Sequence, residues 1–277
     1  MTRQTVGWRE YAIEGVLLAA FMASATVWAT VLQHPASPVA ALVRDDLVRR
    51  LVMGAAMGGT AVALIYSRLG ARTGAHMNPA VTLAYWRLGM VDAQTAVGYC
   101  AAQVVGAVAG EMLVSRLLND LPASPAVGFV ATVPGPSGPA IAFLAELTIS
   151  TVLMALVLTS TRITRLAPYT GLLAGAFVAL CIVVEAPLSG MSMNPARSLG
   201  SNLLAQRLDV FWIYLIAPTL AMQLVAMLFA RTADDGRVRW CPRLYHPSWS
   251  PCVFGCGDSA AIRETPSRSR SDAQHTL

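Results

Sequence analysis

The sequence has no lysine and little charge of either sign. Charged residues make up 13% of the 277 residues, whereas a soluble domain carries about 25%. Hydrophobic residues make up 55%, so the composition excludes an ordinary soluble domain and predicts a polytopic membrane protein. Because every basic side chain is arginine or histidine, we attribute the net charge of +5 to the base composition of the source genome and not to nucleic-acid binding.

Cysteine is also scarce and poorly placed for disulfides. The five cysteines are scattered and odd in number, which makes a poor disulfide framework: Cys100, Cys181, Cys241, Cys252 and Cys256. The apolar segments also lack a nucleophile–base set, a phosphate-binding loop and a catalytic metal cluster. The sequence therefore predicts neither an enzyme nor a cofactor.

Six apolar segments are long enough to cross a bilayer, which takes about 20 residues of helix. They cover roughly 11–33, 47–69, 93–117, 140–161, 168–188 and 209–231. The first 30 residues resemble a secretory signal, but the apolar run from Tyr11 to Leu32 is longer than a signal core, so we interpret it as a retained first span. Because all the spans are helical, we expect a plasma or inner membrane.

Arginines gather on one side of these spans. They precede the first span, follow the second and the sixth, and lie between the fourth and the fifth, whereas the opposite loop 118–139 has none. The positive-inside rule therefore predicts that both termini are cytoplasmic.

One heptapeptide occurs twice in similar form. It reads Gly-Ala-His-Met-Asn-Pro-Ala at 74–80 and Gly-Met-Ser-Met-Asn-Pro-Ala at 190–196. Each copy lies in a half of the chain that crosses the membrane three times, so the second half enters from the opposite face. Inverted repeats of this kind place a site between them at the midplane. We therefore predict an all-α membrane protein with six transmembrane helices and two re-entrant half-helices.

The predicted organisation has four parts. The first repeat covers 1–117 and includes a half-helix at 78–88, and a connecting loop covers 118–139. The second repeat covers 140–231 and includes a half-helix at 194–205. A cytoplasmic tail, partly disordered, covers 232–277.

The tripeptide Asn-Pro-Ala predicts where each half-helix begins. Asparagine is a favoured N-cap and proline is favoured at the next position, so helices should begin at Asn78-Pro79 and at Asn194-Pro195. Ten residues at about 1.5 Å each give roughly 15 Å, which is half of the hydrocarbon core. Each half-helix should enter from one side and end near the centre, after an irregular lead-in, 70–77 or 186–193, that is buried in protein or lines a wet cavity.

The two half-helices should meet tip to tip. Ala80 and Ala196 are small enough for close contact. Each helix N-terminus is equivalent to about half a positive charge, and the amides of Asn78 and Asn194 add hydrogen-bond donors. An oxygen that accepts from both turns its own hydrogens away from its neighbours, which interrupts proton transfer, while the dipoles repel cations. We interpret Asn78 and Asn194 as a pore constriction.

Arg197 lies three residues after Asn194, on the same side of the second half-helix. A charged side chain inside a membrane costs at least about 2.5–3.5 kcal/mol, so it needs a wet pore or a partner. We favour Arg197 as a selectivity gate, and a structural ion pair with Glu185 is the alternative. The equivalent position in the first half is Val81, so the charge lies on one side of the pore only.

These motifs resemble the aquaporin, or major intrinsic protein, family over about 11–231. The second half carries Ser-Gly-x-x-x-Asn-Pro-Ala-Arg-Ser, the first carries Gly-x-His-x-Asn-Pro-Ala-Val-Thr, and the first span of each half carries a glutamate, Glu14 or Glu146. The resemblance implies a homotetramer in the lipid bilayer with one pore per subunit. It also implies that the two glutamates hold the carbonyls of the re-entrant loops and that His76 lines the pore; packing within the loop is the alternative for His76.

The resemblance further implies a selectivity filter of four residues. Counted without gaps from the two motifs, they are Gly58, Ile182, Met191 and Arg197. Water-specific members carry Phe and His at the first two positions. This chain has neither, which implies a wider pore with an apolar wall. We therefore expect a passive channel for water and small uncharged solutes, such as glycerol, urea or neutral metalloid acids, that excludes protons and ions.

A secondary active transporter is the alternative function, because inverted repeats and broken helices occur there too. Such a transporter needs intramembrane groups that bind a coupling ion or proton, and the candidates are Glu14, Glu146 and Glu185. The first two already have a structural role in the resemblance, so the channel is favoured.

The tail contains four side chains of the kind that bind zinc: Cys241, His246, Cys252 and Cys256. Their spacing fits no established zinc pattern, so juxtamembrane packing and a redox-sensitive thiol are alternatives. Residues 257–277 are polar and predicted to be disordered.

Overall fold

The computed structural model describes residues 6–231 and 241–256. Within them, six helices are long and apolar enough to cross a membrane, which confirms the predicted spans. They are α1 (Trp8–Gln33), α3 (Asp46–Tyr66), α6 (Ala93–Leu117), α7 (Gly138–Arg162), α8 (Thr170–Val184, extended by a 3-10 turn at Ala167–Tyr169) and α11 (Phe211–Arg231). The disorder predicted for 257–277 falls outside the described residues.

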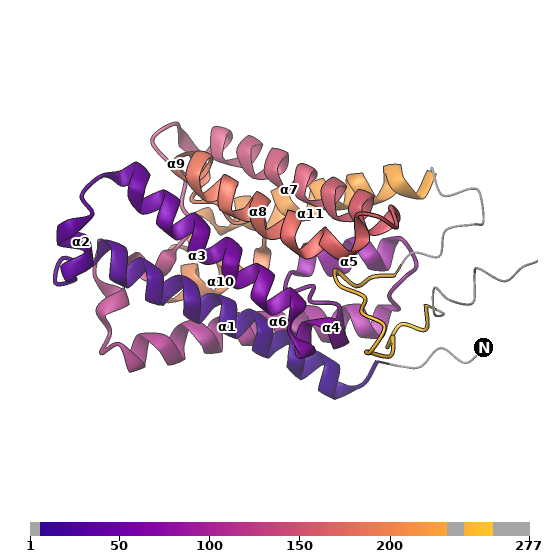
Figure 1. Cartoon of the computed structure of the whole chain (residues 1–277). Coiled ribbons are helices and arrows are strands. Elements are labelled where there is room, and N and C mark those ends of the chain that lie inside the picture. Colours follow the sequence, from indigo (N-terminus) through magenta and orange to yellow (C-terminus); the bar gives the residue numbers. More distant parts are fainter. Residues whose placement is uncertain (1–5, 232–240, 257–277) are drawn as a thin grey trace, which may run out of the picture.

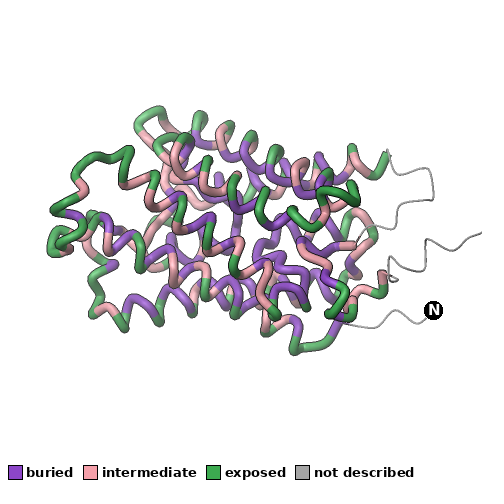
Figure 2. Tube along the Cα trace, viewed as in Figure 1, coloured by how far each residue is buried: buried purple, intermediate pink, exposed green. Residues whose placement is uncertain are grey.

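The long helices lie side by side along the length of the molecule (Figure 1). We call one end the terminal end, because α1 begins there, α11 ends there, and residues 241–256 lie there. At the opposite end, here the α2 end, lie α2 (Pro38–Leu42) and α9 (Ala186–Ser189). The helix surfaces that face inward are buried and many outward surfaces are exposed (Figure 2). The exposed outward residues include many leucines and valines, such as Val105, Leu113 and Leu220, as expected of surfaces that face lipid.

The two half-helices are α5 (Pro79–Arg87) and α10 (Pro195–Leu204). Each begins as predicted: the preceding asparagine is in an extended conformation, its side chain accepts hydrogen bonds from the first turn, and proline occupies the first helical position. Each half-helix packs mainly on the last long helix of the other half, α5 on α11 and α10 on α6. The two halves are therefore interlocked around the centre.

The long helices pair in the same way in both halves. The most extensive contacts are α1 with α6, α3 with α8, and α7 with α11. Glycine makes the close approach of α3 and α8 possible, because a Cβ on Gly58 would lie 2.5 Å from the carbonyl oxygen of Gly175, and a Cβ on Gly175 would lie 2.7 Å from that of Gly58. Small residues at helix contacts are typical of membrane proteins.

The lead-ins are more regular than the sequence predicts. Each contains a short helix, α4 (Arg68–Thr73) before α5 and α9 before α10. After it comes an irregular stretch with left-handed residues at equivalent positions, three in each half: Gly74, Ala75, Met77, Gly190, Met191 and Met193. Left-handed backbone at non-glycine residues persists only where surrounding contacts fix it, and it gathers at functional sites.

Candidate functional site: the junction of the half-helices

The two Asn-Pro-Ala motifs are joined by a reciprocal pair of hydrogen bonds. The side-chain Nδ2 of Asn78 donates to the carbonyl of Met193 over 2.7 Å, and that of Asn194 donates to the carbonyl of Met77 over 2.7 Å. Each asparagine therefore binds the residue that precedes the other asparagine. The predicted meeting of the two tips is present in the structure.

The side-chain oxygen of each asparagine caps its own half-helix. The Oδ1 of Asn78 accepts from the N–H of Ala80 over 2.9 Å, and the Oδ1 of Asn194 accepts from the N–H groups of Ala196 and Arg197 over 3.1 and 3.2 Å. An amide nitrogen carries two hydrogens, and the bond across the junction uses one of them. One donor on each asparagine remains for an oxygen at the junction.

Two buried glutamates hold the stretches that lead to the asparagines. Glu14 of α1 accepts from the backbone N–H of His76 over 3.1 Å and that of Met77 over 2.7 Å. Glu146 of α7 accepts from the N–H of Ser192 over 2.7 Å and that of Met193 over 2.8 Å. A carboxylate only accepts hydrogen bonds, so the expectation that the glutamates hold carbonyls is corrected: they hold N–H groups.

The sequence reasoning missed a second layer of contacts around each glutamate. Thr73 donates its hydroxyl to Glu14, and Ser189 donates its hydroxyl to Glu146, each over 2.7 Å. The signal was available, because Thr73 and Ser189 both directly precede the glycine of the repeated heptapeptide.

Two tyrosine hydroxyls complete this layer. Tyr99 of α6 donates to the carbonyl of Thr73 over 2.9 Å, and Tyr214 of α11 donates to that of Ser189 over 2.6 Å. In the first half Gln103 adds a bond of 3.0 Å to Glu14. The same arrangement thus occurs twice, once in each inverted repeat.

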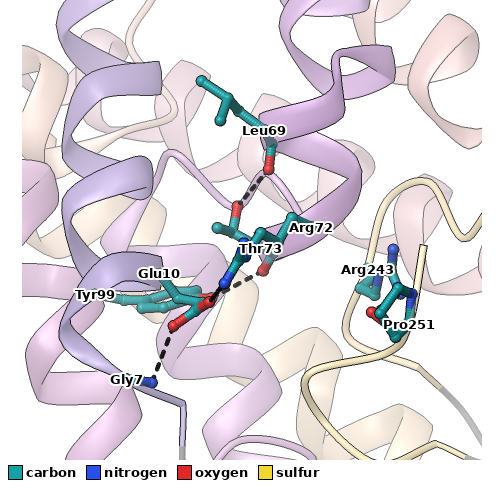
Figure 3. A network of polar contacts seen from close by, with 8 residues as sticks. All are labelled: Gly7, Glu10, Leu69, Arg72, Thr73, Tyr99, Arg243 and Pro251. Atoms are coloured by element: carbon teal, nitrogen blue, oxygen red, sulfur yellow. Dashed lines mark hydrogen bonds and ion pairs between the residues drawn. The ribbon is translucent and has the colours of Figure 1, made fainter.

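A network at the terminal end anchors the first lead-in (Figure 3). Arg72 of α4 forms an ion pair of 2.6 Å with Glu10 of α1, and Glu10 also accepts from the N–H of Gly7 over 3.1 Å. This contact ties α4, and through it the lead-in, to the beginning of α1.

A cavity of about 490 Å³ passes by the junction. Both asparagines line it, and so do Arg49 and Arg50 near the α2 end and Leu244 at the terminal end. One continuous space therefore reaches from one end of the bundle, past the asparagine pair, towards the other.

Three of the four expected filter residues line this cavity, namely Ile182, Met191 and Arg197. The expectation that Gly58 lines the pore is corrected, because Gly58 is not among the residues that line the cavity. Gly58 is buried against α8, as described above, and it is the side chain of Met57 that lines the cavity. A methionine at this position fills space that a glycine would leave empty, so the inference of a widened pore does not hold at this position.

Arg197 is buried on the first turn of α10, and its Nη1 atom has no hydrogen-bond partner among the described residues. The alternative of an ion pair with Glu185 is not realised in the described part of the chain. Because the side chain lines the cavity, the unpartnered N–H groups are available to a solute.

His76 lines the cavity and is also packed within the loop, so both readings of this residue apply in part. Its Nδ1 lies 3.1 Å from the hydroxyl of Thr82 and its Nε2 lies 2.7 Å from the carbonyl of Pro242. The ring stacks on Tyr85, with centroids 5.0 Å apart. The bond to Pro242 joins the pore wall to the tail.

A further buried carboxylate lies on α6 and was not singled out from the sequence. Glu111 accepts from the hydroxyl of Thr26 over 2.6 Å, and its Oε1 has no partner among the described residues. Its position fits no repeated motif, so the sequence offered no signal for it.

The four candidate ligands of the tail are brought together. The sulfur atoms of Cys241, Cys252 and Cys256 and a ring nitrogen of His246 all lie within 4.8 Å of one another. We call residues 241–256 the tail segment.

Comparison with known proteins agrees with this geometry. The profile of the family described as "Major intrinsic protein" matches residues 7–229. The chain belongs to the major intrinsic protein family. The expected resemblance is therefore confirmed, and with it the expectation of a passive channel for water and small solutes; a secondary active transporter is not favoured.

Relatives within the family have two kinds of names. The chain is 32% identical to "Glycerol uptake facilitator protein-like 6" of Lactiplantibacillus plantarum, over 64% of this chain and 82% of that protein. It is 37% identical to "Probable aquaporin AqpM" of Archaeoglobus fulgidus, over 66% and 76%. It is 35% identical to "Aquaporin NIP1-1" of Arabidopsis thaliana, over 67% of this chain and 63% of that protein.

A solved structure supports the fold. The X-ray structure of the aquaglyceroporin from Plasmodium falciparum superposes with a TM-score of 0.65, at 22% identity, and covers 82% of this chain and 98% of that one. Six transmembrane helices and two re-entrant half-helices in inverted repeats are therefore confirmed as the architecture.

Proposed function

We propose that this chain conducts water and small uncharged solutes, with glycerol as the first candidate, and excludes protons and ions. The observation that carries the proposal is the reciprocal bond pair between the two Asn-Pro-Ala motifs beside a cavity that both asparagines line. A solute that passes the junction meets two amide donors and two helix N-termini, each equivalent to about half a positive charge.

Exclusion of ions follows from the same geometry. A cation near the junction is repelled by both helix N-termini and by the guanidinium of Arg197. A water oxygen that accepts from the free N–H of Asn78 or Asn194 turns its hydrogens away from the junction. The hydrogen-bonded chain of water that proton transfer requires is interrupted there.

The proposed filter favours solutes that have a polar edge and an apolar body. Met57, Ile182 and Met191 provide an apolar wall, and Arg197 provides hydrogen-bond donors. The hydroxyl groups of glycerol would accept from Arg197 while its carbon backbone contacts the wall. The name of the Lactiplantibacillus relative supports glycerol, and urea and neutral metalloid acids share the small uncharged character.

The assembly and its surroundings are also proposed. We propose a homotetramer in a plasma or inner membrane, with 1–117 and 140–231 as the two inverted repeats of each subunit and both termini in the cytoplasm. Resemblance to the family supports the tetramer, and the arginines near the terminal end support the orientation. The expected partners are the bilayer and the permeants, with no nucleic acid.

Stopped-flow light scattering of proteoliposomes tests the proposal. Vesicles with the full chain are challenged in turn with sucrose, glycerol, urea and arsenous acid, and protein-free vesicles serve as the control. We expect faster shrinkage in sucrose, which measures water flux, and faster re-swelling in glycerol. Transport that saturates and stops when a proton gradient is collapsed would contradict the channel and favour an active transporter.

A further inference from the structure

The tail segment has no helix or strand in its described residues, yet it is packed against the terminal end of the bundle. The N–H of Leu244 donates to the carbonyl of Gly74 over 3.1 Å, and the carbonyl of Pro242 lies 2.7 Å from Nε2 of His76. The ring of Phe254 lies parallel to that of His76, with centroids 6.1 Å apart. The segment thus contacts the lead-in that ends at Asn78.

Arg243 anchors the beginning of the segment. Its guanidinium is buried and donates to the carbonyl of Ala71 in α4, and to the carbonyl of Ser250 over 3.3 Å. A buried guanidinium is stable only where charge and hydrogen bonds compensate for the loss of water. The described residues give it carbonyl partners but no ion pair.

The segment also carries four side chains that can bind one metal ion, and such an ion would cross-link its two ends. The Sγ atoms of Cys241 and Cys252 lie 3.5 Å apart, and Sγ of Cys256 lies 3.6 Å from Nε2 of His246. All four side chains are half-buried and converge on one point from both ends of the segment.

The separations of 3.5 Å and 3.6 Å fit two ligands of a tetrahedral zinc ion. With zinc–sulfur bonds of about 2.3 Å, tetrahedral ligand atoms lie about 3.5–3.8 Å from one another. Cys252 and Cys256 lie closer, with their sulfur atoms 2.6 Å apart, and would separate by about 1 Å on binding the metal. Three thiolates and one imidazole form a known class of structural zinc site.

We propose that Cys241, His246, Cys252 and Cys256 bind one Zn²⁺ and that the ion fixes the tail segment against the terminal end of the pore. The site would carry one net negative charge with three thiolates, and Arg243 supplies the opposite charge nearby. The proposal stands on the tail geometry and does not rest on the conduction proposed above.

Metal content of the full-length protein tests the proposal directly. The protein is purified in detergent with a phosphine reductant, incubated with zinc chloride, desalted in the presence of a weak chelator, and analysed by mass spectrometry of the metal. We expect about one zinc ion per chain. Co²⁺ in place of zinc should give the visible absorption bands of a tetrahedral thiolate site.

Matched variants separate this site from adventitious binding. Cys252→Ser and Cys256→Ser should lose the metal and the cobalt bands, whereas Cys100→Ser, which changes a cysteine of α6 far along the chain, should keep both. Zinc should also protect the Arg243–Leu244 bond of the wild type from trypsin, and should not do so in Cys252→Ser. Protection from trypsin can be measured on small amounts of protein, so this second readout serves even where a variant is produced in low yield.

Three outcomes would overturn the proposal. They are a zinc content near zero in the reduced wild type, an equal zinc content in wild type and Cys252→Ser, or a Cys252–Cys256 disulfide that persists under the reductant. The last outcome would support a redox-active thiol pair in its place. All three are read from metal content and thiol state and not from solute flux, so failure here and failure of the proposed function are distinguishable.

Discussion

Gly58 of α3 lies directly against Gly175 of α8, so close that a Cβ added to Gly58 would sit 2.5 Å from the carbonyl oxygen of Gly175. This glycine therefore serves helix packing and not the width of the cavity. We expect Gly58→Val to lower the stability of the protein by about 1–3 kcal/mol, the usual effect of overpacking. The melting temperature in detergent measures the effect.

Gly59 provides the matched control for this substitution. A Cβ on Gly59 would have no atom within 4 Å. Because Gly58 and Gly59 both lie inside α3, replacement by valine changes the helix propensity equally at the two positions. Gly59→Val should leave the melting temperature close to that of the wild type. Equal losses for the two variants would contradict the assignment of Gly58 to the helix contact.

Met57 is the residue of α3 that should set the width of the cavity near Arg197. We expect Met57→Phe to reduce glycerol flux more than water flux, because a rigid ring replaces a flexible thioether chain and glycerol has the larger cross-section. Met57→Ala should act in the opposite direction. Flux is measured by light scattering at equal protein density. Identical fractional changes for both solutes would place the narrowest point elsewhere.

Arg197 should control which solutes enter. Its replacement by alanine removes the positive charge and opens space at the cavity wall, so we expect Arg197→Ala to admit larger solutes and small cations. Ion leak is followed with a fluorescent probe inside the proteoliposomes. Arg207→Ala is the control, since Arg207 is half-exposed beside Asp209. Unchanged selectivity in Arg197→Ala would remove this residue from the constriction.

Much of the junction was predictable because its determinants are local. Asn78 and Asn194 act as N-caps through atoms two or three residues away, and proline at the next position fixes the start of each helix. The six spans follow from length and apolar composition alone. Glu14 and Glu146 were found because each occupies the first span of a repeat.

The cavity wall was predictable only in part, because helix register is not a local property. An ungapped count from Asn78 back to α3 passes through α4 and the left-handed turn at Gly74, and the number of residues in that connection decides which side of α3 faces inward. The count gave Gly58, whereas the contact with α8 turns Met57 inward. The contacts of Pro242 and Leu244 with the lead-in join residues far apart in the sequence, and no pattern indicated them.

Glu146 should stabilise the protein mainly through the hydrogen bonds that it accepts and less through its charge. Its carboxylate accepts from the N–H groups of Ser192 and Met193, and Glu146→Ala would leave both donors buried without an acceptor. Each orphaned donor costs about 1–3 kcal/mol, so we expect a large fall in melting temperature. Glu146→Gln keeps one acceptor oxygen and should fall less. A variant Glu146→Ala as stable as wild type would show that the loop holds its shape without this contact.

Removal of zinc should open the terminal end of the pore, if the tail segment is fixed there by the metal. Leu244 is part of the cavity wall, and the carbonyl of Pro242 holds His76. Without the ion, the segment loses the cross-link that keeps Leu244 in place, and we expect water and glycerol flux to rise after treatment with a membrane-permeant zinc chelator. Cys252→Ser should show the raised flux without treatment and no response to the chelator. A wild-type flux that is unaffected by chelation, in protein whose zinc is shown to be removed, would mean that the segment lines the mouth without narrowing it.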